Sequence, residues 1–388
     1  FLYVLVDEYQ DTNSLQAQFT DILAAKHRNI MAVGDDFQCI YTWRGAQIEN
    51  IMEFPSRWPG CRIVKLERNY RSVPSVLDVA NVVMADAESQ FEKTLRPVRA
   101  ADGAKPVLYN VYDGRAQANE ILSGIGRMRQ LGYRLSDMAV LYRSHYQSID
   151  VQMTLARMRI PFRITSGVGV FEQIHVKDTL SYLRLILSPR DELSFHRLVC
   201  LLPGVGEKGA VKMWEKLGRQ FDASRREDRE ALFSLVGAKA KPVCAPLLKC
   251  FDAAYDHLEE DAIGEIVEDF CDLFYEAHLN REWTETDASD RLEDIKELAA
   301  QIAGGEGANG RERLGNFLAD VALLTNLDAK RNNAVEDKVT LSTIHQAKGL
   351  EFPYVFIAGL SEGIMPNKRS VRERKHKAME EERRLMYV

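Results

Sequence analysis

The sequence predicts an α/β fold with parallel sheets, interrupted by an all-helical insertion. Short apolar runs that stop at charged or glycine-containing turns are typical of buried parallel strands. Helical patterns alternate with these runs in the first half of the chain, as in α/β folds with a parallel sheet. From about residue 176 to 335 the periodicity is helical, with almost no strand-like run.

The α/β part is expected to contain, in order, a strand at 1–6, an amphipathic helix at 13–26, strands at 30–33, 62–66 and 137–142 with a helix after Pro74, and strands at 338–342 and 353–358. In the insertion, helical runs include TLSYLRLIL, ALFSLV, IGEIVEDFCDLFYEAHL and DRLEDIKELAAQIA, with a Gly-rich loop at 304–313. The charged stretch 367–384 is expected to be a solvated loop and helix face, with a DNA-contacting patch as the alternative.

The composition limits the classes of function. The 388 residues, 46% of them hydrophobic, are enough for two or three domains with their own cores. A net charge of -6 argues mildly against a purely electrostatic nucleic-acid binder, but an acidic protein can still carry a local basic groove. The six scattered cysteines form no CxxC pair, which favours reduced thiols and a cytoplasmic location. No apolar run is long enough to span a bilayer and no signal peptide is present, so no membrane association is expected.

Both ends of the chain interrupt a pattern. It begins inside an apolar run, FLYVLVDE, and stops at RRLMYV. Neither end resembles a natural terminus, so the sequence is expected to be an internal piece of a longer protein.

The first motif whose residues could take part in catalysis is DEYQDTN, directly after the opening strand. A buried strand ending in Asp-Glu is the Walker B arrangement of nucleotide-hydrolysing motors. Asp7 could hold Mg²⁺, which prefers oxygen ligands and keeps several waters. Glu8 could orient and deprotonate an attacking water. By itself, a strand that ends in two acids more often leads into an ordinary acidic loop, whereas the longer string DEYQDTN is far more specific.

The second motif, GDDFQCIYTWRGA, also follows a short strand. The amide of Gln38 could contact a γ-phosphate and the attacking water. Tyr41 and Trp43 are aromatic residues next to Arg44, and such aromatics can stack on bases. Taken alone, Trp43 is more often a core or surface aromatic with no ligand.

The third motif is LERNYRS. Arg71 could stabilise transition-state charge on a γ-phosphate from a neighbouring domain, in the manner of an arginine finger. Tyr70 could stack on adenine. Taken singly, Arg71 also fits a surface charge.

The fourth motif, TLSTIHQAKGLEF, lies between two predicted strands. Thr343, His345 and Lys348 could hold a phosphate backbone, and Glu351 could accept a ribose hydroxyl. A lone histidine at such a position is also compatible with a structural role.

Together these motifs resemble motifs II, III, IV and V of the UvrD/Rep/PcrA helicases, in order and spacing. EEERRLMYV at 380–388 looks like the opening of motif VI, and IPFRITSGVGVFEQIHVKDTLSYLRLIL at 160–187 resembles the start of the family's helical insertion. The resemblance covers essentially the whole chain. It implies RecA-like P-loop motor domains: residues 1–61 as the C-terminal part of the first, residues 62–175 and 336–388 as the second, and 176–335 as the helical inserted subdomain.

The resemblance also implies an ATP-dependent helicase that moves 3′→5′ on single-stranded DNA, with ATP and Mg²⁺ as cofactors. Asp7 would bind Mg²⁺, Glu8 would be the catalytic base and Gln38 would sense the γ-phosphate. Arg71 would contact that phosphate from the second motor domain. The remaining nucleotide contacts are implied at Tyr70, packed on adenine, and Glu351, on the ribose.

The implied DNA partner is single-stranded DNA, together with junctions between single and double strands. The track would run along five residues, with Trp43 as the stacking platform: Tyr41, Trp43, Arg44, Thr343 and His345. Cys39 stands where the family often has Ser. Protein partners, oligomeric state and cellular pathway cannot be inferred from the sequence.

A further motif lies in the helical insertion. LPGVGEKGA at 202–210 resembles a helix–hairpin–helix turn, in which Gly204 and Gly206 would let backbone N–H groups approach a DNA phosphate. An ordinary Gly-rich turn between two helices fits the same residues equally well.

The sequence contains no GxxxxGK[ST] phosphate-binding loop. The chain alone is therefore expected not to hydrolyse ATP. Two other functions stay open: a non-catalytic DNA- or partner-binding module, and the motor part of a RecB/AddA-like helicase–nuclease.

Overall fold

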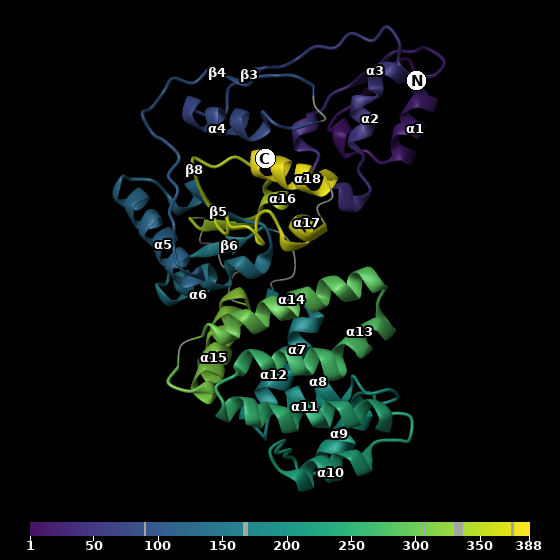
Figure 1. Ribbon diagram of the computed structural model, residues 1–388, viewed down its shortest axis with the longest axis vertical. Coiled ribbons are helices and arrows are strands. Elements are labelled where there is room, and N and C mark those ends of the chain that lie inside the picture. Colours follow the sequence, from purple (N-terminus) through teal and green to yellow (C-terminus); the bar gives the residue numbers. More distant parts are fainter. Residues whose placement is uncertain (89–90, 166–169, 306, 330–336, 374–375) are drawn as a thin grey trace. The chain divides into compact units, whose positions relative to one another are not determined.

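The computed structural model describes residues 1–88, 91–165, 170–305, 307–329, 337–373 and 376–388. The chain divides into two compact units, coloured by sequence in Figure 1. The α/β unit comprises Phe1–Thr154, Ile160–Ser166 and Glu336–Val388, and the helical unit comprises Leu155–Arg159 and Gly167–Val335.

The α/β unit contains parallel sheets, as the sequence predicts. β1 (Val4–Val6) pairs with β2 (Ile30–Ala32), and β3 (Arg68–Asn69) pairs with β4 (Arg96–Pro97). The largest sheet has the order β6 (Phe162–Ile164), β7 (Val339–Thr343), β5 (Met138–Tyr142) and β8 (Tyr354–Ile357), with every pair parallel. β7, from the end of the chain, lies between two strands that precede the helical unit. The helical residues are therefore inserted between strands of a single sheet.

The helices of this unit begin where their capping residues permit. Asn13 accepts a hydrogen bond from the backbone N–H of Gln16, whose side chain accepts from the N–H of Asn13 in return. Pro74 opens its helix at a position where a missing N–H is tolerated. The helices are α1 (Ser14–Ala24), α2 (Ile48–Met52), α3 (Phe54–Arg57), α4 (Pro74–Met84), α5 (Gly114–Gln130), α16 (Ile344–Ala347), α17 (Lys368–Glu373) and α18 (His376–Tyr387), together with the first part of α6 (Ile149–Arg157), whose last three residues belong to the helical unit.

One predicted strand is wrong. Residues 62–66 (RIVKL) form no strand; the nearest pairing is that of Arg68 and Asn69 with β4. The side chains of Ile63, Val64 and Leu66 are exposed. The run has β-branched residues, but β propensity is decided by packing and pairing, and neither is present at these residues.

The opening strand also differs from the expectation of a fully buried element. The side chain of Leu5 is 73% exposed, and that of Met31, its register partner in β2, is 56% exposed. Successive side chains of a strand point to opposite faces, so β1 and β2 share one open apolar face.

The helical unit contains no strand among its described residues, as predicted. Its helices are α7 (Ile174–Leu187), α8 (Glu192–Val199), α9 (Glu207–Lys216), α10 (Arg226–Leu235), α11 (Lys241–Glu259), α12 (Ile263–Phe270), α13 (Glu276–Glu282), α14 (Glu285–Ala303) and α15 (Gly310–Ala329). A π-helical turn, Cys271–Tyr275, joins α12 to α13. α7 is buried along most of its length, and its Tyr182 stacks on Phe270 with ring centroids 4.4 Å apart.

The buried side chains of Asp178 and His175 in the helical unit have polar partners. The carboxylate of Asp178 receives Arg197 at 2.6 Å and the hydroxyl of Tyr275 at 2.5 Å. His175 lies 3.0 Å from a carboxylate oxygen of Asp294. Charges removed from water require such partners.

Parts of four predicted segments lie outside the described residues. These are 166–169 of the 160–187 segment, 306 of the Gly-rich loop, 374–375 of the charged stretch, and 330–336, which include the predicted end of the insertion. In the described part of the chain, no helix combines the length and apolar character needed to cross a bilayer.

Gly124 and Gly126 of α5 test how tightly this helix packs. A Cβ on Gly124 would lie 2.5 Å from the ring of Phe356 in β8, whereas a Cβ on Gly126 would meet nothing within 4 Å. We expect Gly124→Ala to destabilise the chain by about 1–3 kcal/mol because of overpacking. Gly126→Ala should stabilise it by roughly 0.5–1 kcal/mol through helix propensity. Urea unfolding of both variants measures this; equal changes in the free energy of unfolding would contradict the packing.

Candidate functional site

The two acids after β1 lie in a fixed, exposed turn. Glu8 has a positive φ of 50°, uncommon for a residue with a side chain, and its backbone N–H donates to Asp7 Oδ1 at 2.9 Å. Tyr9 N donates to Val33 O, which ties the turn to the end of β2. Both carboxylates therefore face solvent from a backbone that is held in place.

A buried glutamine connects this acidic turn to the next motif. Gln10 Nε2 donates to Glu8 Oε2 at 2.6 Å, and Gln10 Oε1 accepts from the backbone N–H of Asp35 at 2.9 Å. The side chain of Gln10 is fully buried. Gln10 was not singled out from the sequence; it lies in the DEYQDTN motif, but its partner 25 positions away shows only in the structure.

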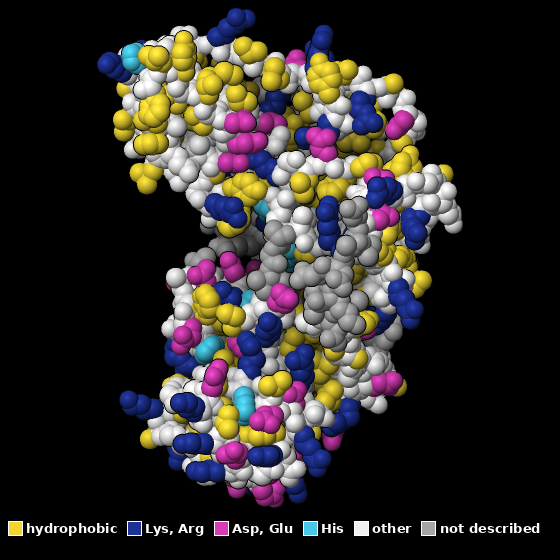
Figure 2. All heavy atoms as spheres, turned by 180° about the vertical axis from the view of Figure 1, so that it is seen from behind, with side chains coloured by type: hydrophobic (Ala, Val, Ile, Leu, Met, Phe, Trp, Pro, Cys, Tyr) yellow, Lys and Arg dark blue, Asp and Glu magenta, His cyan; other side chains and the backbone are white. Residues whose placement is uncertain are grey.

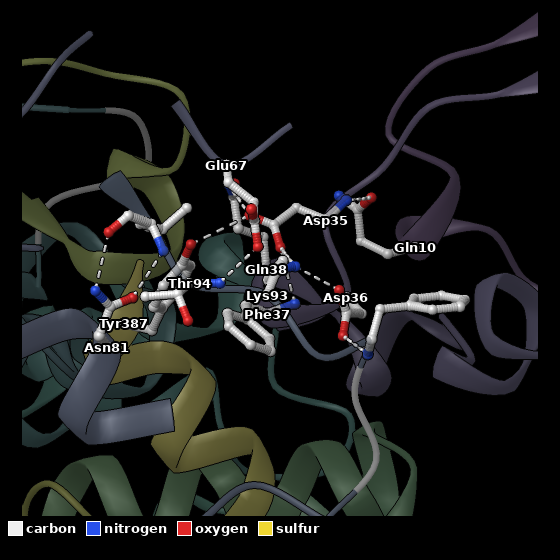
Figure 3. A network of polar contacts seen from close by, with 12 residues as sticks. Gln10, Asp35, Asp36, Phe37, Gln38, Glu67, Asn81, Lys93, Thr94 and Tyr387 are labelled. Carbon is white, nitrogen blue, oxygen red and sulfur yellow. Dashed lines mark hydrogen bonds and ion pairs between the residues drawn. The ribbon is translucent and has the colours of Figure 1, made fainter. Parts of the chain in front are cut away.

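Gln38 is held at both its side chain and its backbone. Its Nε2 donates to Asp35 Oδ2 at 2.9 Å, one of the contacts drawn in Figure 3. Asp35 also caps the short 3₁₀ helix Asp36–Gln38 by accepting from Phe37 N. The carbonyl of Gln38 accepts from Lys348 Nζ at 3.1 Å.

Lys348 does not lie where a DNA-phosphate contact requires. Its side chain is only 7% exposed, and its ammonium contacts Asp11 at 2.6 Å and Glu8 at 3.5 Å. This corrects the expectation that Lys348 holds a phosphate backbone, because a buried ammonium is already neutralised by these acids. Burial raises the pKa of Asp11, and the hydrogen bond and charge of Lys348 oppose that rise.

Arg71 and Glu351 lie together on the surface. Arg71 Nε and Glu351 Oε1 are 2.6 Å apart, and both side chains are more than half exposed. Such an exposed pair contributes little to stability. Tyr70, the predicted adenine contact, is 68% exposed beside them. Arg71 has no hydrogen bond or ion pair with Asp7 or Glu8 in the described structure, so these groups are not brought into direct contact.

Of the residues predicted to contact DNA, Tyr41 is held by a hydrogen bond, whereas Trp43 and Arg44 are exposed. Tyr41 donates its hydroxyl to the carbonyl of His345 at 2.8 Å, which braces it against motif V. Trp43 is 65% exposed, and the guanidinium of Arg44 lies 4.5 Å from its ring centroid. Trp43 and Arg44 thus form an exposed cation–π pair.

Thr343 and His345 are positioned below this surface. Thr343 is buried, and its hydroxyl caps α16 by accepting from Gln346 N. Burial lowers the pKa of His345 to about 4, with the nearby guanidinium groups of Arg143 and Arg44 adding to the effect. His345 is therefore neutral at physiological pH.

In the helical unit, the predicted hairpin turn lies between α8 and α9. Gly204 has a φ of +78°, which favours glycine, and Gly206 is the N-cap residue of α9. Both glycines are exposed, with open space where a Cβ would be. This geometry fits both an ordinary turn and a backbone surface for a phosphate.

Two carboxylates at the end of β1 present oxygen atoms to solvent. Asp7 and Glu8 offer exposed carboxylate oxygens, the ligand type that Mg²⁺ prefers. One carboxylate oxygen of Asp7, Oδ1, accepts a hydrogen bond from the adjacent backbone N–H of Glu8.

Comparison with known proteins identifies the family. Residues 1–59 match the UvrD/REP helicase N-terminal domain, and residues 64–388 match the UvrD-like helicase C-terminal domain. The chain therefore belongs to the UvrD/REP helicase family, which confirms the resemblance seen in its motifs.

The similar relatives include ATP-dependent DNA helicase PcrA of Bacillus subtilis (strain 168), 33% identical over 394 residues. PcrA of Staphylococcus aureus (strain Mu50) is 34% identical over 393 residues. Each comparison covers 100% of this chain and 53% of the relative. The chain thus spans about half the length of the curated relatives it matches.

The pKa of His345 predicts a pH dependence of stability. The unfolded state takes up a proton near the ordinary value of 6.5, whereas the folded state does so near 4. The stabilisation is therefore complete above pH 6.5 and is lost as pH falls toward 4. Between pH 8 and pH 5 this group should remove about 2 kcal/mol from the free energy of unfolding.

Urea unfolding of the wild type and His345→Asn at both pH values measures this contribution. Gln346→Ala, in the same short helix but without a titratable group, is the control and should keep the wild-type pH dependence. An identical pH dependence in His345→Asn and the wild type would contradict the assignment.

Proposed function

We propose that the protein carrying this chain is an ATP-dependent DNA helicase that moves 3′→5′ along single-stranded DNA. The observation that carries the proposal is the continuous line of hydrogen bonds from Glu8 through Gln10 and Asp35 to Gln38. It joins a Walker B-type acidic turn to an amide that precedes an exposed Trp–Arg pair. Membership of the UvrD/REP helicase family and likeness to PcrA support the same function.

On the nucleotide side, each group has a role that its position supports. Asp7 would hold Mg²⁺, which supplies charge neutralisation at the phosphates. Glu8 would accept the proton of the attacking water, with its carboxylate oriented by Gln10. Gln38 would orient that water or a γ-phosphate oxygen. These carboxylates and the amide belong to one prearranged network, so little reorganisation is needed during reaction.

The second motor segment would complete the nucleotide site. Arg71 would leave its exposed pair with Glu351 and stabilise charge on the γ-phosphate, at small energetic cost because that pair is solvated. Glu351 would then be free to accept a ribose hydroxyl. The exposed ring of Tyr70 would pack on the adenine.

On the DNA side, Trp43 would stack on a base and Arg44 would add cation–π and phosphate contacts. Tyr41 and His345 would brace this platform. Recognition through base faces and phosphates gives low sequence specificity.

The direction of movement is tested with a fluorophore at the 5′ end of a single strand. A motor that moves 3′→5′ should reach this fluorophore, and preferential arrival at the 3′ end would refute the proposed direction.

Catalysis by Glu8 is tested with the chain and with the longer protein that we propose, which would also carry a phosphate-binding loop. We expect no ATP turnover from the chain alone, because none of its residues form a GxxxxGK[ST] loop. In the longer protein, Glu8→Gln should lower the DNA-stimulated kcat by roughly 10²–10⁴-fold through loss of the base. Steady-state phosphate release measures both expectations.

The control for this experiment is Glu53→Gln, an exposed acid outside the network, which should leave turnover unchanged. Robust turnover by the isolated chain, or a fully active Glu8→Gln protein, would refute the assignment.

Trp43 is predicted to carry much of the affinity for single-stranded DNA. In the longer protein, Trp43→Ala should weaken binding by about 1–3 kcal/mol, roughly 5- to 150-fold, because one stacking platform is lost. Tyr112→Ala, which removes an exposed aromatic remote in sequence from the motifs, is the matched control. Fluorescence anisotropy with oligothymidylate measures both; equal affinities for the two variants would argue against stacking.

A further inference from the structure

The ammonium of Lys93 lies between two adjacent carboxylates. Its Nζ is 2.5 Å from Asp35 Oδ1 and 2.5 Å from Asp36 Oδ1. It also lies 3.9 Å from the ring centroid of Phe37. The Lys93 side chain is 12% exposed and that of Asp36 is 3% exposed, so this is a largely desolvated ion pair. A cation bound by two acids and an aromatic face restrains the turn that these three residues form.

The same turn orients Gln38. Asp35 accepts Lys93 on Oδ1 and the amide of Gln38 on Oδ2, so one carboxylate links the two side chains (Figure 3). A carboxylate only accepts hydrogen bonds, so Asp35 must face the Nε2 end of the Gln38 amide. The Oε1 of Gln38 is then the end of the amide that does not bond to Asp35, and the proposed function gives it the role of accepting a water proton.

Lys93 belongs to a segment locked to the Arg71 turn. Thr94 N donates to the Glu67 carboxylate at 3.1 Å, and Arg96 N donates to Glu67 O at 2.7 Å. β4 then pairs in parallel with β3, which ends two residues before Arg71. These contacts connect the backbone that precedes Arg71 to the backbone that carries Lys93.

A second contact holds this segment to α4. Leu95 N donates to Asn81 Oδ1, and Asn81 Nδ2 donates back to Leu95 O, both at 3.0 Å. Asp36 Oδ2 accepts from Phe91 N at 2.9 Å. Lys93 is therefore the charged contact in a set that joins the segment following α4 to the turn before Gln38.

We propose that Lys93 is a positioning residue that sets the orientation of Gln38 through Asp35, and that it transmits the position of the Arg71 turn to that amide. The inference rests on the proposed function, since Gln38 matters only if the protein turns over ATP. Lys93 itself has no expected contact with nucleotide or DNA. Its effect on turnover is exerted mainly through the contact between Asp35 and Gln38.

The first test measures kinetics of the longer protein with single-stranded DNA. Lys93→Met should lower the DNA-stimulated kcat by roughly tenfold or more, with the KM for ATP changed by less than about threefold. Lys65→Met is the matched control: Lys65 donates to the carbonyl of Glu92, on the same segment, but does not touch Asp35. It should keep the wild-type kcat. An unchanged kcat in Lys93→Met would overturn the proposal.

A double-mutant cycle separates positioning from general destabilisation. If Lys93 acts through Gln38, Lys93→Met should have no further effect on kcat in a Gln38→Ala background. An equal fold-loss in both backgrounds would overturn the proposal. If Lys93→Met fails to fold, Asp36→Asn is the alternative, because it removes the second carboxylate that pairs with Lys93. Its loss of kcat should be smaller and should also disappear in the Gln38→Ala background.

A measurement without turnover completes the test. Hydrogen–deuterium exchange of peptides spanning 34–42 should be faster in Lys93→Met than in wild type, and unchanged in Lys65→Met. Equal protection in all three proteins would overturn the proposed restraint. If the wild type shows no DNA-stimulated ATP turnover, the proposed function fails, whereas hydrogen exchange still decides whether Lys93 restrains this turn.

Discussion

The buried ammonium of Lys348 imposes the main constraint on this site. A charge removed from water must be paired, and removing one partner of such a pair costs roughly 3–5 kcal/mol. Lys348 is paired with Asp11 and Glu8 and donates to the carbonyl of Gln38. One side chain from the end of the chain thus fixes the acidic turn and the glutamine motif from its beginning, with Asp11 337 positions away.

Other polar contacts of the site also join residues that are far apart in the chain. The Tyr41 hydroxyl reaches the carbonyl of His345, and Lys93 reaches Asp35 and Asp36. Most of these residues lie in turns after parallel strands, where α/β proteins collect their functional groups. The exposed Asp7 and Trp43 lie within two residues of Glu8 and Tyr41, whose side chains make such contacts. The supporting residues are therefore arranged to restrain the residues expected to meet ligands.

Much of the site could be predicted because its members follow strands in short motifs. Asp7, Glu8, Gln38 and Trp43 were found this way, and family membership confirms the resemblance from which their roles were inferred. Their roles and the predicted division of motor domains stay predictions. Gln10 and Lys93 were missed because their partners are remote in the chain and nothing local marks them. Lys348 was misread for the same reason: its motif shows a lysine but not the acids around it.

The sequence by itself determined the parallel α/β class, the helical insertion and the positions of the motifs. These follow from local periodicity and from short-range capping, which act within a few residues. Only the tertiary structure decided which runs pair as strands, which charges are buried and which amide faces which carboxylate. The exposed run 62–66 illustrates the limit: its β-branched residues favour a strand, but a strand also needs a hydrogen-bonding partner from elsewhere in the chain.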